Sequence, residues 1–222
     1  MHVTSPFLDC LDAGARAALE SLGTRRHAPA GGYLLLEGEA ANRIGVIHSG
    51  LVKVTVGHPD GYEAVLAVVG PGELLGEVAA FDGGIRSASA SAMTACEIQF
   101  VPVTEFERLI EQHPVIAVAL VRTLAARLRE SDSHRLSSAA DGVPRRLARR
   151  LLQLGHDHGR LDGESIEIDL AFSQEDLAGL VGASRDAVAK SLRAWREQGF
   201  VATRRRRIVL VDPAGLSRQH RL

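Results

Sequence analysis

Hydrophobic and polar residues follow two different periods along this chain of 222 residues. From about residue 26 to residue 102, short runs rich in Val, Ile and Leu alternate with turns that contain glycine, a pattern typical of β-strands. The expected strands are Tyr33–Glu37, Arg43–Gly50, Leu51–Gly57, Glu63–Gly70 and Cys96–Val101. Glycine in the turns keeps such strands short and lets the backbone approach a ligand closely. The pattern predicts a compact antiparallel β-roll or barrel.

The apolar spacing is helical on either side of this region. Residues 7–22 have the pattern of one short amphipathic helix. After Pro114 the sequence continues without a helix breaker to about residue 140, which predicts a long helix. Its heptad positions form an apolar seam that becomes polar halfway along: Ala117, Val121, Leu124 and Leu128. Packing against its own domain would also explain the seam, but a long helix between two modules favours a two-stranded dimer.

A turn signal at 141–144, Asp-Gly-Val-Pro, predicts a hinge before a C-terminal region with helices of its own. The first of these helices is expected over residues 145–159. Ser173 and Ser184 can each cap the start of a further helix, and Gly182 between them permits the left-handed backbone of a tight turn. Two capped helices joined by such a turn predict a helix-turn-helix.

The second helix of this pair carries the candidate DNA-reading side chains. Its apolar residues occupy one face, which leaves Arg185, Asp186 and Lys190 on the other. Arg suits guanine O6 and N7, Asp can accept from the amino group of cytosine, and Lys can reach a guanine or a phosphate. Beyond Gly199, two apolar runs flank Arg204–Arg207 and predict a β-hairpin wing whose charged tip suits phosphates.

Charge is distributed unevenly between the two regions. Residues 1–142 carry 11 Lys and Arg residues against 17 Asp and Glu residues, whereas residues 143–222 carry 15 against 10. A basic C-terminal region is typical of a nucleic-acid-binding module. No apolar run reaches the roughly 18 residues of a membrane span, and the first residues lack the features of a signal peptide, so we expect a cytoplasmic protein.

One stretch of the β-rich region, residues 72–90, combines glycine and small residues with two isolated charges. Glu77 and Arg86 lie nine positions apart, on a segment expected to be a loop. Arg can hold a phosphate with a planar set of donors, and a carboxylate accepts from hydroxyls. The pair suits a ligand with both a phosphate and a sugar hydroxyl, although a surface turn with a charge at each end would look similar.

The order of β-roll, long helix and winged helix-turn-helix resembles the family of the bacterial cyclic-AMP receptor protein and the fumarate-nitrate regulator, the CRP/FNR family. The resemblance extends over roughly residues 5–215. GEVAAFDGGIRSA, from Gly76 to Ala88, is similar to the phosphate-binding cassette of the family, and VGASRDAVAKSL, from Val181 to Leu192, to its recognition helix. The implied fold is α+β. Its three parts are an antiparallel β-roll that binds an effector (1–112), a dimerisation helix (113–140) and a winged helix-turn-helix that binds DNA (141–222).

The resemblance also implies the residues of the effector site. Arg86 and Ser87 would hold a cyclic phosphate, and Glu77 with the backbone of Gly76 would hold the ribose 2′-hydroxyl. The complete candidate set is Gly76, Glu77, Val78, Arg86, Ser87, Ala88, Ser131 and Asp132.

Ser131 and Asp132 stand where the cyclic-AMP receptors commonly have a Thr-Ser or Thr-Asn pair that contacts adenine. A carboxylate accepts from the exocyclic amino group of adenine or guanine alike, so cyclic AMP is the first expectation and cyclic GMP the second. The complete candidate set for DNA is Ser173, Gln174, Ser184, Arg185, Asp186, Lys190, Arg204, Arg205, Arg206 and Arg207.

Other effectors within the family, and action without a ligand, stay open as alternatives. Two cysteines, Cys10 and Cys96, are too few for a four-thiolate iron–sulfur cluster. A haem ligand would come from His27, His48, His58 or His113. An isolated His on a strand or loop is more often structural, and a haem sensor has no need of the set of Glu77, Arg86 and Ser87, which favours a nucleotide.

An enzyme is a further alternative, because His156-Asp157-His158 has chelating spacing. The triplet is expected in a solvated loop without an evident third ligand, and the chain lacks the phosphate-binding and nucleophile-turn motifs, so we expect neither a metal site nor catalysis.

The wing could also contact a protein instead of DNA. Its arginines and the excess of basic residues in the C-terminal region argue against this alternative. We expect double-stranded DNA with a palindromic operator, a cyclic nucleotide, a second copy of the chain and RNA polymerase as partners, and no membrane.

Overall fold

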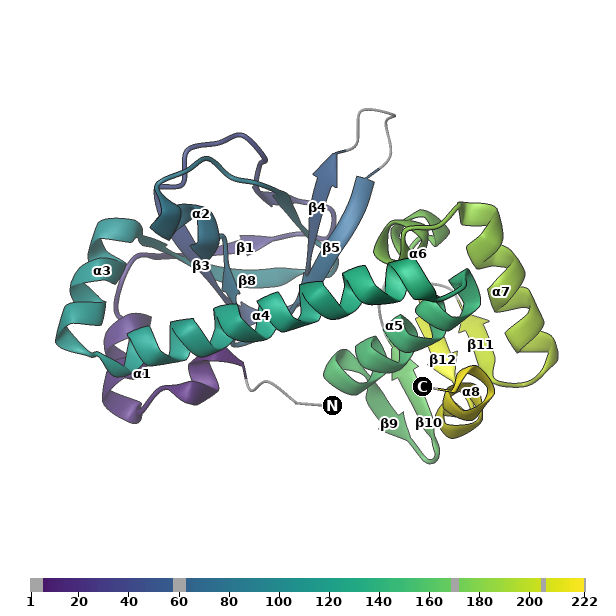
Figure 1. Ribbon diagram of the computed structural model, residues 1–222. Coiled ribbons are helices and arrows are strands. Elements are labelled where there is room, and N and C mark those ends of the chain that lie inside the picture. The colour runs from purple at the N-terminus through teal and green to yellow at the C-terminus, as the bar shows by residue number, and fades with distance from the viewer. Residues whose placement is uncertain (1–5, 58–62, 169–171, 205–206, 222) are drawn as a thin grey trace. The chain divides into compact units, whose positions relative to one another are not determined.

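The computed structural model describes residues 6–57, 63–168, 172–204 and 207–221 (Figure 1). These residues fall into two compact units. One unit comprises the described residues up to Val56 and residues Ala67–Ser133. The other unit comprises the described residues of Gly57–Leu66 and the described residues from His134 to the C-terminus. The three-part division at residues 112 and 140 stays a prediction.

Two four-stranded sheets form the β-rich region, and the pairings recorded between their strands are antiparallel. The first sheet has the order β1 (Thr24–Ala28), β8 (Cys96–Pro102), β3 (Arg43–Ser49), β6 (Leu74–Leu75). The second has the order β2 (Tyr33–Leu35), β7 (Ser89–Ala92), β4 (Val52–Gly57), β5 (Glu63–Val69). The five predicted strands are present as β2, β3, β4, β5 and β8, and the predicted antiparallel β architecture is confirmed.

Three strands of these two sheets, β1, β6 and β7, were not predicted from the apolar pattern. β1 has the sequence Thr-Arg-Arg-His-Ala, and all but its last residue are exposed. It forms because it pairs along its whole length with β8, from Thr24 opposite Phe100 to Ala28 opposite Cys96. β7 consists only of Ser and Ala, and β6 has two residues. Pairing with a neighbouring strand, rather than an apolar run, therefore determines these strands.

Two expectations for local structure were wrong. Residues 7–22 do not form one helix: a 3-10 helix at Phe7–Cys10 is followed by helix α1 (Ala13–Glu20). The break occurs because Asp12 caps α1, its Oδ1 accepting from the Ala15 N–H at 2.8 Å. The segment with Glu77 and Arg86 is not all loop either, since Glu77 begins helix α2 (Glu77–Asp82). A six-residue helix among glycines gives too weak a periodic signal to be predicted.

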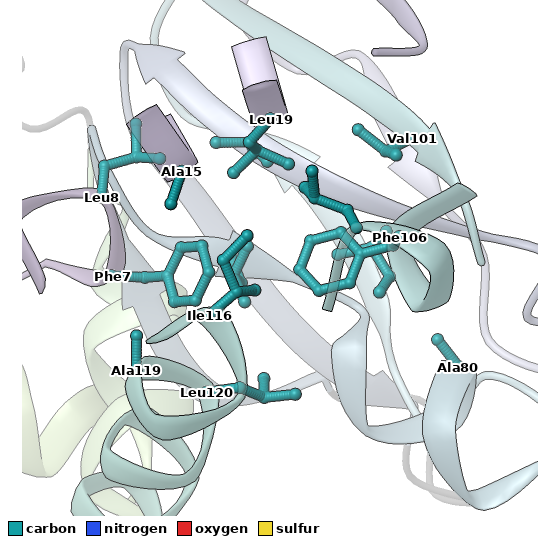
Figure 2. Close-up of a cluster of buried hydrophobic side chains, with 14 residues drawn as sticks. Phe7, Leu8, Ala15, Leu19, Ala80, Val101, Phe106, Ile116, Ala119 and Leu120 are labelled. Carbon is teal, nitrogen blue, oxygen red and sulfur yellow. The ribbon is translucent and has the colours of Figure 1, made fainter. Parts of the chain in front are cut away.

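Helices α3 (Val103–Gln112) and α4 (Val115–Ala140) follow the sheets, and α4 confirms the predicted long helix. The first turns of α4 contribute Ile116, Ala119 and Leu120 to a buried cluster with residues of the N-terminal segment and α3, among them Phe7 and Phe106 (Figure 2). Phe7 and Phe106 lie 6.4 Å apart between ring centroids. This cluster anchors the start of the long helix to its own domain.

The apolar seam predicted along α4 is divided in the structure. Val121 and Leu128 are each 64% exposed, whereas Leu124 is half-buried and packs against the cluster at the start of the helix. Ala117 is also half-buried. The face left uncovered in this chain instead carries Val118, Val121 and Leu128. Leu124 therefore contributes to the packing of its own unit, and its place in a dimer seam stays a prediction, since the half-buried side chain keeps part of its surface exposed.

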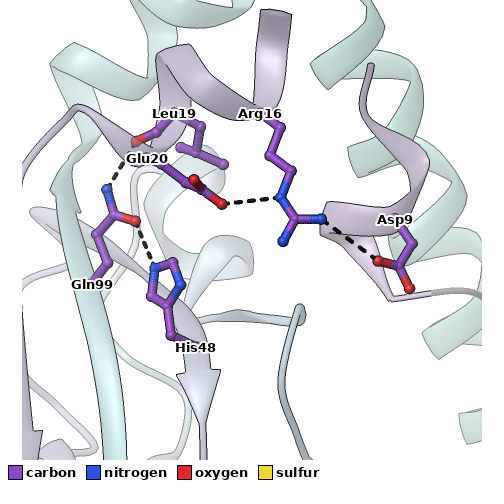
Figure 3. A network of polar contacts seen from close by, with 6 residues as sticks. All are labelled: Asp9, Arg16, Leu19, Glu20, His48 and Gln99. Carbon is purple, nitrogen blue, oxygen red and sulfur yellow. Dashed lines mark hydrogen bonds and ion pairs between the residues drawn. The ribbon is translucent and has the colours of Figure 1, made fainter. Parts of the chain in front are cut away.

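Gln99 of β8 joins the first sheet to α1 (Figure 3). Its side chain is fully buried, and its Nε2 donates to the carbonyls of Leu19 at 2.8 Å and Leu22 at 2.6 Å. Its Oε1 lies 2.9 Å from Nε2 of His48, which must then donate. Because His48 has this structural partner, its presence needs no ligand to explain it.

The second unit contains a four-stranded sheet with the order β11 (Val201–Arg204), β12 (Arg207–Leu210), β10 (Ser165–Ile168), β9 (Arg160–Asp162). Its helices are α5 (Val143–His158), α6 (Gln174–Val181), α7 (Arg185–Glu197) and α8 (Pro213–His220). His156-Asp157-His158 lies in the last turn of α5, in agreement with the helix predicted over residues 145–159 and not with the loop expected for the triplet. Among the described residues, no group of three His, Cys, Asp or Glu could hold a metal ion.

In the described part of the chain, no single helix has both the length and the apolar character of a membrane span. One pair, Val103–Gln112 with Val115–Ser133, meets these criteria only jointly and is bent by 117°.

Candidate nucleotide and DNA sites

The start of α2 is built around Gly76, which has a left-handed backbone with φ of 77°. A Cβ atom at this position would lie 2.5 Å from Nη1 of Arg86 and 2.8 Å from Cδ1 of Leu35. Only glycine satisfies both the backbone angle and the close approach. Gly76 therefore allows the Arg86 guanidinium to lie against the first residues of α2.

Arg86 is a buried cation, with only 3% of its surface exposed. Its Nη1 donates to the Gly76 carbonyl and its Nη2 to the Arg43 carbonyl, while its Nε is buried with no partner among the described residues. Burial lowers the pKa of the guanidinium from its usual value, and the charge of Arg43 adds to this, whereas Glu39 and Glu77 act in the opposite direction. A buried guanidinium with one N–H group that has no partner among the described residues can donate to a bound anion such as a phosphate.

Glu77 is also buried, with 1% exposure. Its Oε1 accepts from Nη1 of Arg127, and its Oε2 is buried with no partner among the described residues. Arg127, from α4, also donates from Nη2 to the Leu74 carbonyl at 2.7 Å. One carboxylate oxygen is thus held by an arginine, and the other has a free acceptor position among the described residues.

The sequence interpretation missed Arg127. It precedes Ser131 by one helical turn, so the two residues share a face of α4. That spacing could have identified it, since a residue one turn before Ser131 lies on the same face of the helix as this predicted base contact. Asp132 is five positions after Arg127 and is rotated by about 140° from it, so it does not share this face.

The remaining predicted nucleotide residues lie closer to the surface. Val78, Ser87, Ser131 and Asp132 are exposed, and Ala88 is half-buried. A cavity of about 260 Å³ beside Arg86 is lined by Leu35, Glu39, Ala40, Asn42, Arg43 and Arg86. Arg86 is the only member of the predicted set in this cavity. The structure therefore brings together Gly76, Glu77 and Arg86, and leaves the two polar residues of α4 at the surface.

The histidines considered as haem ligands lie on different elements of the structure. His27 is exposed on β1, His48 contacts Gln99, and His113 follows the last residue of α3. His58 lies outside the described residues.

The two helices of the predicted helix-turn-helix have the predicted caps. Ser173 accepts from the Asp176 N–H at 2.9 Å, and Asp176 accepts in return from the Ser173 N–H at 2.9 Å, which forms a capping box at the start of α6. Gly182 ends α6 with φ of 60°. Ser184 then caps α7 by accepting from the Ala187 N–H at 3.3 Å. The predicted helix-turn-helix is confirmed at the level of these local contacts.

The two faces of α7 differ as the apolar spacing predicted. Val188, Leu192 and Trp195 are buried. Arg185, Asp186 and Lys190 are exposed, together with Gln174 at the start of α6. A surface with these side chains at the N-terminal end of a helix can present them to base edges in a major groove.

Strands β11 and β12 form the predicted hairpin wing, with Thr203 opposite Ile208 and Arg204 opposite Arg207. Both arginines are exposed, and Nη1 of Arg207 contacts Oε1 of Glu167 at 2.9 Å. Arg205 and Arg206, which were also predicted to contact DNA, lie outside the described residues.

Comparisons with known proteins agree with this geometry. Residues 25–113 match the model of the cyclic nucleotide-binding domain, and residues 145–219 match that of the Crp-like helix-turn-helix domain. A CRP-like cAMP-activated global transcriptional regulator of Mycobacterium tuberculosis is 33% identical over 193 residues, covering 87% of this chain and 86% of the relative. The cyclic AMP receptor protein of Thermus thermophilus is 33% identical over 177 residues, covering 80% and 79%.

Solved structures show the same architecture. The c-di-GMP-responsive global regulator CLP of Xanthomonas campestris has a TM-score of 0.78 and 25% identity, covering 90% of this chain and 99% of that one. A CRP-family transcriptional regulator of Thermus thermophilus has a TM-score of 0.75 and 27% identity, covering 89% and 97%.

Fold and site together define a DNA-binding transcription regulator with a cyclic nucleotide-binding domain. The chain belongs to the CRP/FNR family, whose members are transcription regulators and not enzymes.

Proposed function

We propose that the protein is a cytoplasmic homodimer that binds a palindromic operator in response to cyclic AMP, and that it acts together with RNA polymerase. The observation that carries the proposal is a pair of unpartnered buried atoms. Nε of Arg86 is a donor and Oε2 of Glu77 is an acceptor, and neither has a partner among the described residues. A cyclic nucleotide offers a phosphate to the first and a ribose 2′-hydroxyl to the second.

Each charged residue has a distinct role in this proposal. Arg86 uses two N–H groups to fix its own orientation on carbonyls, and its remaining donors bind the phosphate. Arg127 neutralises Glu77 and orients its free oxygen toward the 2′-hydroxyl. Ser87 adds a hydroxyl donor to the phosphate, and Ser131, on the face of α4 that carries Arg127, contacts the base.

Isothermal titration of the full chain with cyclic AMP tests the proposal, with cyclic GMP and cyclic di-GMP as parallel titrations. Cyclic GMP is included because it has the same cyclic phosphate and ribose that Arg86 and Glu77 are proposed to bind, and cyclic di-GMP because of the structural similarity to a regulator that responds to it. We expect saturable binding of cyclic AMP with one site per chain. If heat of binding is measured only with cyclic GMP or only with cyclic di-GMP, that nucleotide is the effector. If none of the three nucleotides gives a heat of binding, control by a nucleotide is contradicted.

Replacing Glu77 with Ala is expected to weaken recognition of the ribose selectively. Loss of one charge-assisted hydrogen bond costs about 1.5–3 kcal/mol, or about a tenfold to hundredfold loss in affinity for cyclic AMP. The affinity for 2′-deoxy-cyclic AMP, which lacks the accepted hydroxyl, should change much less. Titration of both nucleotides into both proteins measures this. A variant that still discriminates against the deoxy analogue as strongly as the wild type would contradict the role of Glu77.

A second copy of the chain is the proposed cover for the exposed apolar face of α4. Val118, Val121 and Leu128 are 49%, 64% and 64% exposed and recur at three- and seven-residue spacing along one helix. Burying such a stripe against the same stripe of a partner forms a two-stranded coiled coil.

Replacing Val121 and Leu128 together with Asp should therefore dissociate the dimer, since facing carboxylates would be buried in an apolar interface. Sedimentation velocity is expected to show a shift from dimer to monomer. The control is Leu136→Asp. Leu136 is 73% exposed but lies beyond the stripe, on the polar half of the helix. A double variant that stays dimeric would mean that α4 does not form the interface.

Ligand binding would control DNA binding through the arrangement of the two α4 helices. A ligand shifts a two-state equilibrium only through its different affinity for the two states. The element that differs is proposed to be the hinge at 141–144, which sets the direction of the two recognition helices. When these lie about 34 Å apart, both enter successive major grooves of one face of the duplex.

A further inference from the structure

Arg146, near the start of α5, binds three backbone carbonyls with one guanidinium. Its Nε donates to the Val181 carbonyl at 2.9 Å, its Nη2 to the Gly182 carbonyl at 3.0 Å, and its Nη1 to the Asp141 carbonyl at 2.8 Å. The first carbonyl belongs to the last residue of α6, the second to the turn between α6 and α7, and the third to the segment that precedes α5. One side chain thus joins three backbone segments of the DNA-binding unit.

The carbonyls at the end of α6 need such a partner. The last carbonyls of a helix have no intrahelical donor, and a cation there also interacts favourably with the helix dipole. Val181 is the last residue of α6, and Gly182 follows it in the left-handed conformation with φ of 60°. The capping residue of the recognition helix, Ser184, is two positions further on. Fixing the carbonyls of Val181 and Gly182 therefore fixes the point at which α7 begins.

The third carbonyl is itself held in place. The side chain of Asp141 contacts Nη1 of Arg145 at 3.3 Å and Nη1 of Arg149 at 2.9 Å, and is only 8% exposed. These ion pairs bind the segment before α5 to the first two turns of that helix. Arg146 therefore connects the helix-turn-helix turn to a segment that is already fixed on α5.

We propose that Arg146 is a positioning residue for DNA recognition: by holding the α6–α7 turn on α5, it sets where Arg185 meets a base. Its donors are directed at three carbonyls, and its effect on DNA is exerted through the recognition helix. Arg185 is the first residue of α7, so a small displacement of the turn displaces its guanidinium from a guanine edge. Contacts with phosphates tolerate such a displacement better, because they depend less on direction.

The geometry requires a guanidinium. Arg presents its donors in a rigid planar fork, which lets Nε, Nη1 and Nη2 each reach a different carbonyl. Lys has one nitrogen at the end of a flexible chain and cannot reach all three carbonyls from one place. Replacement by Lys should therefore preserve the charge and lose most of the positioning.

The experiment compares Arg146→Gln, Arg146→Lys and the wild-type full chain on two duplexes. One duplex is the sequence that the wild type enriches from a randomised pool, and the other is a scrambled version of it. Fluorescence anisotropy is measured at one salt concentration. The nucleotide is present or absent according to which gives the tightest binding of the wild type. Arg218→Gln is the control, because Arg218 lies on α8 of the same unit, is exposed and contacts the Asp212 side chain at 3.9 Å, and it takes no part in holding Asp141 or the α6–α7 turn.

We expect both Arg146 variants to lose about tenfold or more in affinity for the enriched duplex and less than about twofold for the scrambled one, since a mispositioned base contact reduces specific binding only. The Arg218 control should keep the wild-type ratio of the two affinities. Thermal melting of each variant sets a working temperature at which all are folded. Equal losses on both duplexes, an unchanged ratio for either Arg146 variant, or the same change in the Arg218 control would overturn the proposal.

Discussion

Replacing Arg86 with Leu is expected to reduce the affinity for cyclic AMP about a hundredfold, which corresponds to about 3 kcal/mol. Leu is similar in bulk to the aliphatic part of Arg but offers no donors and no charge to a phosphate. The substitution also leaves the Gly76 and Arg43 carbonyls without the N–H groups that they accept from. Isothermal titration measures the loss of affinity, and thermal melting measures the accompanying loss of stability.

Two further variants separate binding from folding. Arg86→Lys keeps the positive charge but cannot serve both carbonyls and a phosphate, so we expect weak binding with a melting temperature nearer to that of the wild type. Arg25→Leu is the matched control: Arg25 lies on β1 of the same unit and contacts Glu97 at 3.2 Å at the surface. It should bind cyclic AMP like the wild type. An Arg86→Leu protein that binds as tightly as the wild type would show that the phosphate lies elsewhere.

Replacing Arg185 with Ala is expected to cost about 1–3 kcal/mol on the operator sequence and to relax the preference for one guanine in each half-site. Arg185 is exposed at the first position of α7, where a side chain can reach a base edge. Binding to a scrambled duplex should be almost unchanged, because it depends on phosphates. A fluorescence-anisotropy salt titration on both duplexes measures the two effects.

Substitutions in the wing should give a result that contrasts with that of Arg185→Ala. Arg204 and Arg207 face each other across the hairpin and are exposed, with Arg207 beside Glu167. Replacing both with Ser should weaken binding to all duplexes alike and reduce the salt slope by about one unit for each lost phosphate contact in each subunit. If the Arg185 variant lost affinity equally on both duplexes while the wing variant lost only sequence preference, the wing would be the reading element.

Segments whose structure depends on nearby residues could be predicted from the order of amino acids. The helix-turn-helix is such a case, since Ser173, Gly182 and Ser184 act within a few residues of their own positions. The five predicted strands and the long helix α4 likewise follow from apolar residues that repeat at the period of each element. In the proposed nucleotide site, Glu77 and Arg86 became candidates through the similarity of their segment to the phosphate-binding cassette of the family, because two isolated charges alone would also suit a surface turn.

Other features depend on residues far apart in the chain, which no local pattern encodes. Arg127 meets Glu77 across 50 positions, and Arg146 meets the Gly182 carbonyl across 36. β1 exists only because β8 lies beside it, and Leu124 turns to its own core because residues near the N-terminus supply the other side of that core. The local patterns therefore determine which elements form and which residues are candidates for binding. Tertiary packing decides which charges are buried, because burial and pairing depend on the segments that the fold places around them.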